Sequence, residues 1–344
     1  MKETTLTNNA MITDPKFAHL KACTEVYNDH NYKQSLKITL DTNYHSYLCH
    51  HTFGGKCYVP ATMIMELFAE SALFFTSRFA TKDKDNLIAG IENFNVLRAI
   101  TIEYGNKIEA QINLIEISVQ GSLKILSIEI LSKRIAESGR VIGSRINATC
   151  EVIISPNLYT PAKFISPNHN FKQYCFPKEL FYEYYFASLG KMFQTQTGNF
   201  KINLEEKMLI GTYNLEGKER NFINGQECDF ILSPLGLDSC LQYTVFLSRL
   251  LALKGRLPVS CRKLQIFRNH PVNGNCNVYV QCQKIDDSIM DAFFWIFDQC
   301  DKPIVYVENV IVQYAPVNNT TEIYTNKDLF SGLLEKHCYK SPWN

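Results

Sequence analysis

The chain has 344 residues, of which 46% are hydrophobic and 20% are charged, and its formal net charge is +1. A chain of this length accommodates one large or two medium domains, each with a buried core. A net charge near zero supplies no overall field for nucleic acid or for an anionic membrane, so we expect neither as a partner. Charges also interrupt every apolar run before the ~20 residues that a membrane-spanning helix requires.

The twelve cysteines are scattered, and no two of them form a C-x-x-C pair. The first residues, MKETTLTNNA, lack the basic start and the apolar run of a secretion signal. We therefore expect a cytoplasmic protein whose thiols stay reduced and mostly fill the core.

The first part of the chain predicts a helix among strands. Residues 1–34 are polar and weakly patterned, which indicates an N-terminal extension. A strand is expected over 35–40, and an irregular segment over 45–59. Pro60 then precedes a run, 61–79, that is apolar on more than one face, as in a buried helix. Strands with alternating apolar residues are expected at 86–96, 99–104, 107–119, 123–132 and 140–154.

The same order of elements occurs a second time. Residues 156–176 are rich in proline and asparagine and are expected to be a linker. A helix is expected at 177–188 and a second long apolar helix at 234–253. Strands are expected at 199–204, 208–213, 257–267, 276–284, 289–297 and 303–314. This architecture predicts two α+β units, 35–155 and 177–315, followed by a tail at 316–344.

Two short motifs stand immediately before or within the two long helices. The first is H-x-x-x-G-x-x-x-x-P, formed by His51, Gly55 and Pro60. The second is D-x-x-x-Q, formed by Asp238 and Gln242. Residues four apart share one face of a helix, so the aspartate and the glutamine can act together.

These motifs resemble those of the dehydratase domains of polyketide synthases. The family pattern H-P-x-L-x-D-H-x-V-x-G-x-x-x-x-P overlies residues 45–60 almost position by position, and the family's D-x-x-x-Q/H falls on 238–242. Two further motifs are partly kept at 189–194 and 257–262, and all four stand in the family's order over roughly residues 35–315. The chain departs from the pattern in having Ser46 for proline, His50 for aspartate and Cys261 for tryptophan.

The resemblance implies a fold, an activity and a set of partners. The fold is an α+β double hotdog, two tandem units that each wrap a curved antiparallel sheet around a long helix. The activity is loss of water from a 3-hydroxyacyl thioester without a cofactor, in polyketide or fatty-acid-like biosynthesis. The substrate would be carried by phosphopantetheine on an acyl-carrier protein, and synthase components would be further partners; a homodimer is left open.

The resemblance also implies roles for individual residues. His51 would be the base and Asp238 the acid, supported by Gln242 and by backbone N–H groups near Gly55. Residues expected to bind substrate are Pro60, Leu189, Gly190, Phe193 and Val259. Residues expected to contact the carrier protein are Arg262 and Lys263. No metal site is implied.

The chemistry requires these residue types. A base must remove the proton at C2, and histidine suits this because its ordinary pKa lies near neutrality. The acid must hold its proton, although a free aspartate has a pKa of ~3.9. Burial can raise that pKa by ~3–5 units, more than the helix dipole lowers it.

Other interpretations remain open from sequence alone. Cys49, His50, His51 and Cys57 could bind a metal, but paired ligand spacing is absent. Cys57 could act as a nucleophile with His51, the basic residues 256, 262, 263 and 268 could be a solvated strand face, and Tyr182, Tyr184 and Tyr185 are interpreted as packing. Alternative activities are isomerisation, cyclisation or hydration on the same fold, or acyl binding by a non-catalytic scaffold.

Overall fold

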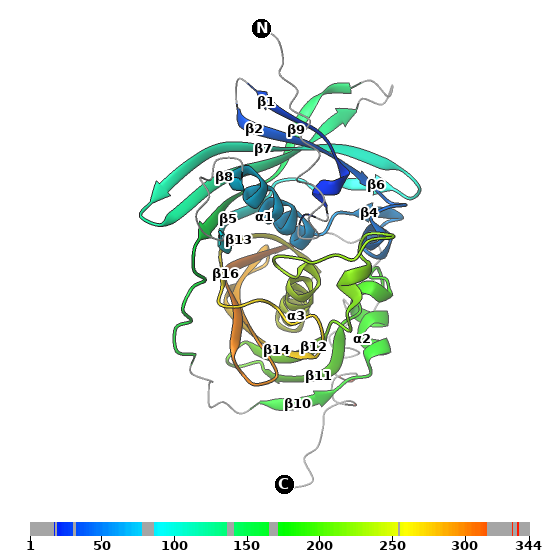
Figure 1. The fold of residues 1–344 in the computed structure, drawn as a ribbon. Coiled ribbons are helices and arrows are strands. Elements are labelled where there is room, and N and C mark those ends of the chain that lie inside the picture. The colour runs from blue at the N-terminus through cyan, green and yellow to red at the C-terminus, as the bar shows by residue number, and fades with distance from the viewer. Residues whose placement is uncertain are drawn as a thin grey trace.

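The structure, a computed structural model, describes residues 17, 19–29, 32–77, 86–135, 141–164, 171–253 and 255–314, together with 332 and 336. One antiparallel sheet of thirteen strands curves around two long helices, α1 and α3, which lie one above the other (Figure 1). The strand order is β1-β2-β7-β8-β9-β5-β13-β16-β15-β14-β12-β11-β10. The first six strands wrap α1 and the other seven wrap α3, which is the two-unit arrangement that the sequence predicts.

The first unit is built around α1, Ala61–Ser77. Fourteen residues of this helix are buried, which explains why its apolar side chains are distributed around the helix and not along one face. Its strands alternate apolar side chains toward the helix, as Leu36, Ile38 and Leu40 do. The strands are β2 (Tyr32–Asp41), β5 (Leu87–Val96), β7 (Lys107–Gln120), β8 (Leu123–Ile135) and β9 (Val141–Ser155).

A small separate sheet lies beside the start of α1. It consists of β3 (Thr52–Phe53), β4 (Lys56–Tyr58) and β6 (Thr101–Glu103). The 3₁₀ turn η4 (Ser46–His50) precedes it. The segment 45–59, expected to be irregular, is therefore a short turn followed by a hairpin.

The second unit repeats the plan around α3, Pro234–Ala252. Its strands are β11 (Gln196–Asn203), β12 (Met208–Asn214), β13 (Arg256–Ile266), β14 (Asn275–Ile285), β15 (Ile289–Phe297) and β16 (Pro303–Tyr314). A shorter helix, α2 (Lys178–Tyr185), packs beside the sheet, and the 3₁₀ turns η5 (Lys191–Phe193) and η6 (Lys218–Asn221) complete the unit.

The two units share one sheet because β5 pairs with β13 in antiparallel register, with Gln265 opposite Gly90. A Cβ atom at residue 90 would lie 2.2 Å from the carbonyl oxygen of Leu264, so the close approach of the two strands requires glycine there. This joint places the starts of α1 and α3 on the same side of the molecule, where the site lies.

Two expectations about the ends of the units are wrong. The described part of the extension expected at 1–34 contains β1 (Cys23–Asp29), which pairs with β2, and β2 begins at Tyr32 rather than at 35. The linker expected at 156–176 contains β10 (Lys172–Cys175), which pairs with β11. Both are edge strands, each of which pairs with a neighbour on one side only in the sheet. The end of the helix expected at 79 and, apart from 332 and 336, the tail expected at 316–344 lie outside the described residues.

Within the described part of the chain, no helix combines the length and hydrophobicity needed to cross a membrane.

Candidate active site

His51 lies between the two units. It directly follows η4, its backbone N–H donates to the carbonyl of Leu48 (3.2 Å), and its own carbonyl accepts from the N–H of Tyr58 (2.9 Å). It also forms an isolated antiparallel bridge with Leu189 of the second unit. The backbone around this histidine is thus fixed from both sides.

The segment 189–193 packs directly against the histidine. The N–H of Gly190 donates to the carbonyl of His50 at 2.8 Å. A Cβ atom at residue 190 would lie 2.3 Å from Nδ1 of His50 and 3.0 Å from its Cα, so glycine is required for this contact. The ring of Phe193 is centred 5.2 Å from that of His51. Leu189 and Phe193 therefore stand beside His51, and Gly190 stands beside His50.

Asp238 projects from the beginning of α3. The helix starts after Ser233, whose side chain accepts a hydrogen bond from the N–H of Gly236 (3.3 Å), and Pro234 occupies the first turn. Asp238 is only 7% exposed. Nε2 of Gln242, four residues further on, donates to Oδ2 of Asp238 at 2.8 Å, so the two side chains are hydrogen-bonded to each other on one face of the helix.

Gln242 is itself fixed by a buried tyrosine. Its Nε2 also donates to the carbonyl of Phe193 (3.0 Å), and its Oε1 accepts from the hydroxyl of Tyr182 (3.0 Å). The Tyr182 oxygen in turn accepts the N–H groups of Thr195 (2.8 Å) and Gln196 (3.0 Å). This chain of hydrogen bonds orients the amide, and through it the carboxyl group of Asp238.

The interpretation of Tyr182 as a packing residue is therefore incomplete. The Tyr182 side chain is buried, and its hydroxyl donates to the amide of Gln242, which in turn donates to the carboxyl group of Asp238. No local sequence signal could reveal this role, because Gln242 lies sixty residues further along the chain. Tyr185 is a buried core residue, and the side chain of Tyr184 lies outside the described part of the structure.

The electrostatics of the pair favour a neutral base and a protonated acid. Burial lowers the pKa of His51 below its ordinary 6.5, and Asp238 partly offsets this. Burial raises the pKa of Asp238 above its ordinary 3.8, and the nearby His51 and the hydrogen bond from Gln242 partly offset that. Each group influences the pKa of the other, so the two side chains from different units lie within electrostatic reach.

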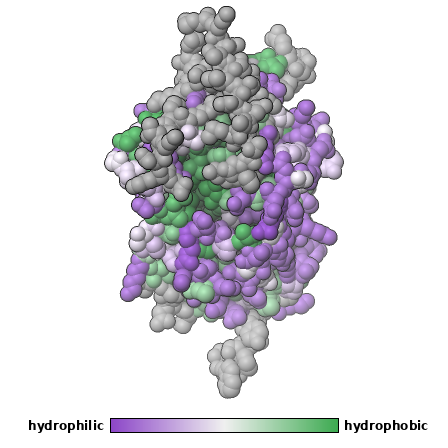
Figure 2. All heavy atoms as spheres, in the orientation of Figure 1, coloured by the Kyte–Doolittle hydropathy of each residue, from purple (hydrophilic) through white to green (hydrophobic). Residues whose placement is uncertain are grey.

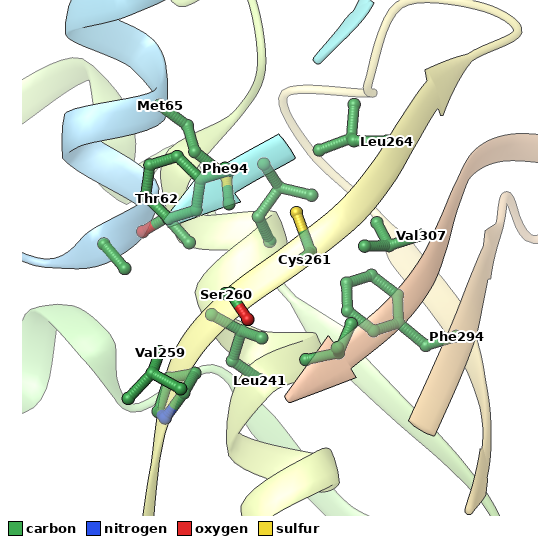
Figure 3. A pocket seen from close by; sticks show the side chains of 14 residues that line it. Thr62, Met65, Phe94, Leu241, Val259, Ser260, Cys261, Leu264, Phe294 and Val307 are labelled. Atoms are coloured by element: carbon green, nitrogen blue, oxygen red, sulfur yellow. The ribbon is translucent and has the colours of Figure 1, made fainter. Parts of the chain in front are cut away.

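An apolar pocket lies between the units along α3. Side chains from α1, β5, β13 and α3 converge on it, among them Met65, Phe94, Val259 and Leu241 (Figure 3). Leu237, the neighbour of Asp238, also lines it. Its free interior measures about 20 Å³, room for about one water molecule, so an acyl chain could enter only if side chains move. Figure 2 shows a hollow with hydrophobic side chains on the face seen in Figure 1, near the level of α1.

The local backbone structure explains the other two candidate residues, Gly55 and Pro60. Gly55 lies in the exposed turn between β3 and β4 with φ of +78°, and nothing comes within 4 Å of where its Cβ would be. The turn, rather than a close approach, explains this glycine. Pro60 is buried and its carbonyl accepts the N–H groups of Met63 and Ile64, so it fixes the start of α1.

The basic residues expected to meet a carrier protein already have partners. Arg262 pairs with Glu308, and Lys263 lies 3.6 Å from Glu92. Arg268 pairs with Asp298 at 2.7 Å, and Arg256 is buried and donates to backbone carbonyls. For Arg262 and Lys263 this pairing is that of a solvated strand face, and it leaves little uncompensated positive charge there.

The alternative chemistry of the cysteines has little support. No group of three or more histidine, cysteine or acidic side chains in the described ranges could hold a metal ion. Cys57 is buried, and burial raises the pKa of its thiol, which disfavours the thiolate that a nucleophile needs.

Comparison of the sequence with protein-family models finds no match, and comparison with curated proteins finds none either. Solved structures, however, match over most of the chain. The GphF dehydratase 1 has a TM-score of 0.61 at 14% identity, covering 82% of this chain and 94% of its own. The dehydratase domain from the CurJ module of curacin polyketide synthase has a TM-score of 0.62 at 16% identity, covering 85% and 96%.

A bifunctional dehydratase-cyclase domain from ambruticin biosynthesis matches as well, with a TM-score of 0.58 at 13% identity, covering 85% of this chain and 96% of that one. At such low identity the likeness establishes the fold alone. The expected fold class and the family resemblance in structure are confirmed: this chain has the double-hotdog fold of polyketide synthase dehydratase domains.

Proposed function

We propose that this protein removes water from a 3-hydroxyacyl thioester and releases a 2-enoyl thioester, with the substrate carried on the phosphopantetheine arm of an acyl-carrier protein. One observation carries the proposal. A histidine from the first unit and a carboxylic acid from the second are brought together in a buried setting that shifts their pKa values in opposite directions. An elimination needs a neutral base and a protonated acid together.

In the proposed reaction, His51 accepts the proton from C2 and Asp238 gives its proton to the hydroxyl at C3. The C2–H electron pair becomes the new C2–C3 double bond, and the C3–O bond breaks as water leaves. His51 is then protonated and Asp238 ionised, so one proton passes back through water before the next turnover.

The surrounding groups have supporting parts. Gln242 and Tyr182 hold the carboxyl group of Asp238 in one orientation, which reduces the reorganisation needed in the transition state. Backbone N–H groups at the start of α1, after Pro60, would polarise the thioester carbonyl. The acyl chain would enter the apolar pocket beside Leu237 and Val259.

The test is product analysis with the wild-type protein. A 3-hydroxyacyl group loaded on a phosphopantetheinylated carrier protein is incubated with enzyme, and the acyl group is released and identified by mass spectrometry and NMR. We expect loss of one water and a double bond between C2 and C3. If the carrier is bound but the substrate returns unchanged, the proposal of catalysis fails in favour of a scaffold.

A second candidate is double-bond migration or ring closure on the same site. It has a specific observation behind it, because the matching structures include a dehydratase-cyclase and a GphF variant described as isomerase-inactive. The same product analysis separates the candidates: migration would place the double bond beyond C3, and cyclisation would give an oxygen heterocycle from a substrate with a second hydroxyl. The reverse reaction, hydration, is detected by starting from the enoyl thioester.

A further inference from the structure

Glu66 is a buried acid outside the proposed catalytic pair. It lies on α1 in the first unit and is 0% exposed. Its Oε1 accepts the N–H of Ile231 and its Oε2 accepts the N–H of Leu232, both at 2.8 Å. A carboxyl group that uses both oxygens on two consecutive backbone donors fixes the position of that backbone strongly. Residues 231 and 232 belong to the second unit, so this contact crosses between the units.

The backbone that Glu66 holds leads directly into the helix of the acid. Ser233 follows at once and caps α3, and Asp238 comes five residues later. Glu219 supports the same turn, since it accepts from the hydroxyl of Ser233 (3.0 Å) and from the N–H of Leu235 (2.7 Å). The direction in which α3 starts, and hence the place of Asp238, is set by these two buried carboxyl groups.

The other end of the connection leads to the base. Glu66 lies six residues after Pro60, on the helix that continues the His51 segment. The base, His51, and the acid, Asp238, come from different units. Glu66 lies on α1, which follows His51 in the chain, and it binds residues 231 and 232, which immediately precede α3 and Asp238. We infer that Glu66 is a positioning residue that aligns Asp238 with His51 across the two units. The inference rests on the proposed dehydration.

Glu70 provides a matched control on the same helix. It lies one turn further on, is also 0% exposed, and accepts the N–H groups of His19 (3.1 Å) and Leu20 (3.2 Å). Its Oε1 also lies 2.8 Å from Nδ1 of His19. Glu70 thus also accepts two backbone N–H groups of a distant segment, but that segment is the N-terminal one instead of the one before α3. A purely structural role would give the same phenotype at both positions.

The experiment compares Glu66→Gln, Glu66→Asp and Glu70→Gln with the wild type, using the full chain and the carrier-bound substrate. We expect both Glu66 variants to lower kcat about 10- to 100-fold, as a small misplacement of a reacting group does, and to change KM little. Glu70→Gln should lose stability comparably to Glu66→Gln but retain kcat. Glu66→Asp keeps the carboxyl group with a shorter reach, so it serves if Glu66→Gln does not fold.

A second readout needs no substrate. With ¹³C-labelled aspartate, the carboxyl signal and the pKa of Asp238 are expected to change in the Glu66 variants and to stay as in the wild type in Glu70→Gln. Equal loss of kcat in the Glu66 and Glu70 variants, or an unchanged Asp238 signal in Glu66→Gln, would overturn the inference. Absence of turnover in the wild type would instead remove the proposed function, while the labelled carboxyl still tests the positioning.

Discussion

The two central helices carry similar pairs of buried polar side chains for different purposes. On α1, Glu66 and Glu70 stand four residues apart, and the oxygens of both accept hydrogen bonds from backbone N–H groups of distant segments. On α3, Asp238 and Gln242 have the same spacing, but within the described residues Asp238 receives a hydrogen bond from Gln242 alone. The carboxyl oxygens of the acids on α1 already accept hydrogen bonds from the protein backbone. The carboxyl group of Asp238 on α3 can still accept a hydrogen bond from another molecule.

The comparison shows what separates a structural acid from a functional one on the same scaffold. Burial raises the pKa of all three acids, so the shift by itself does not distinguish them. The difference lies in whether the fold already uses the acceptor positions, and in whether a titratable partner such as His51 stands opposite. The predictions below sharpen or break this distinction.

The largest effect is expected from the proposed pair itself. His51→Ala and Asp238→Asn should each lower kcat about 10²- to 10⁴-fold, the usual contribution of an acid or base. Both variants should unfold within a few degrees of the wild-type melting temperature, because the fold does not use all the hydrogen-bonding positions of either side chain. Turnover of the carrier thioester and thermal unfolding measure the two properties. A wild-type rate in either variant would mean that other residues act as the acid and the base.

A smaller loss is expected at the contact between the units. Gly190→Ala would place a Cβ atom 2.3 Å from Nδ1 of His50, so the histidine segment must shift. We expect kcat to fall about 10- to 100-fold and stability to fall by about 1–3 kcal/mol. Gly105→Ala is the control, because that glycine has φ of +80° but open space around it. Similar kcat losses in both would show that strain alone, not the shift of His51, is responsible.

A few-fold loss of kcat is expected when the orientation of Gln242 is loosened. Tyr182→Phe removes the hydroxyl that donates to Gln242 and that accepts the N–H of Gln196, at a cost of about 1–3 kcal/mol, whereas the N–H of Thr195 still donates to the carbonyl of Phe193 (3.1 Å). Tyr243→Phe is the matched control, because its hydroxyl bonds only to the backbone of Thr212 among the described residues. It should lose stability and keep kcat. An equal loss of kcat in Tyr182→Phe and Tyr243→Phe would show that Tyr182 does not orient Gln242 in the site.

The smallest effect concerns stability and pH. Burial raises the pKa of Glu219 from 4.5 to about 7, so the folded state holds this proton more tightly than the unfolded chain. The associated stability is fully present below pH 4.5 and is lost as the pH rises through about 7. Glu219→Gln should make the decline over this interval shallower, by on the order of 1 kcal/mol, in denaturation measured at several pH values. A slope that stays the same would mean that Glu219 titrates normally.

The sequence predicts the framework of this protein well because helices and central strands bury strongly periodic apolar surface. The helix expected at 234–253 is observed at Pro234–Ala252, and the strand expected at 303–314 has those bounds. The edge strands β1 and β10 escape prediction because one side of each pairs with nothing in the sheet. The motifs single out His51 and Asp238, and in the structure these two side chains lie within electrostatic reach of each other.

The supporting residues are not predictable in the same way. Glu66 reads as a polar interruption in an apolar helix, and its partner Ile231 lies 165 residues away. Tyr182 and Gln242 lie sixty residues apart. The first contact depends on how the two units dock, and the second on how α2 meets α3 within one unit. Both are properties of the folded chain and not of any local pattern. The carrier contact expected at Arg262 and Lys263 stays a prediction, although both side chains already have acidic partners.

The most direct test is a reciprocal titration by NMR of the free protein, with labelled histidine and aspartate. The charge on each group favours the charged form of the other, so removing one should displace the pKa of its partner. We predict that His51→Gln raises the pKa of Asp238 further and that Asp238→Asn lowers the pKa of His51 further. If both values stay where they are in the wild type, the two side chains do not face each other and the proposed acid–base pair is wrong.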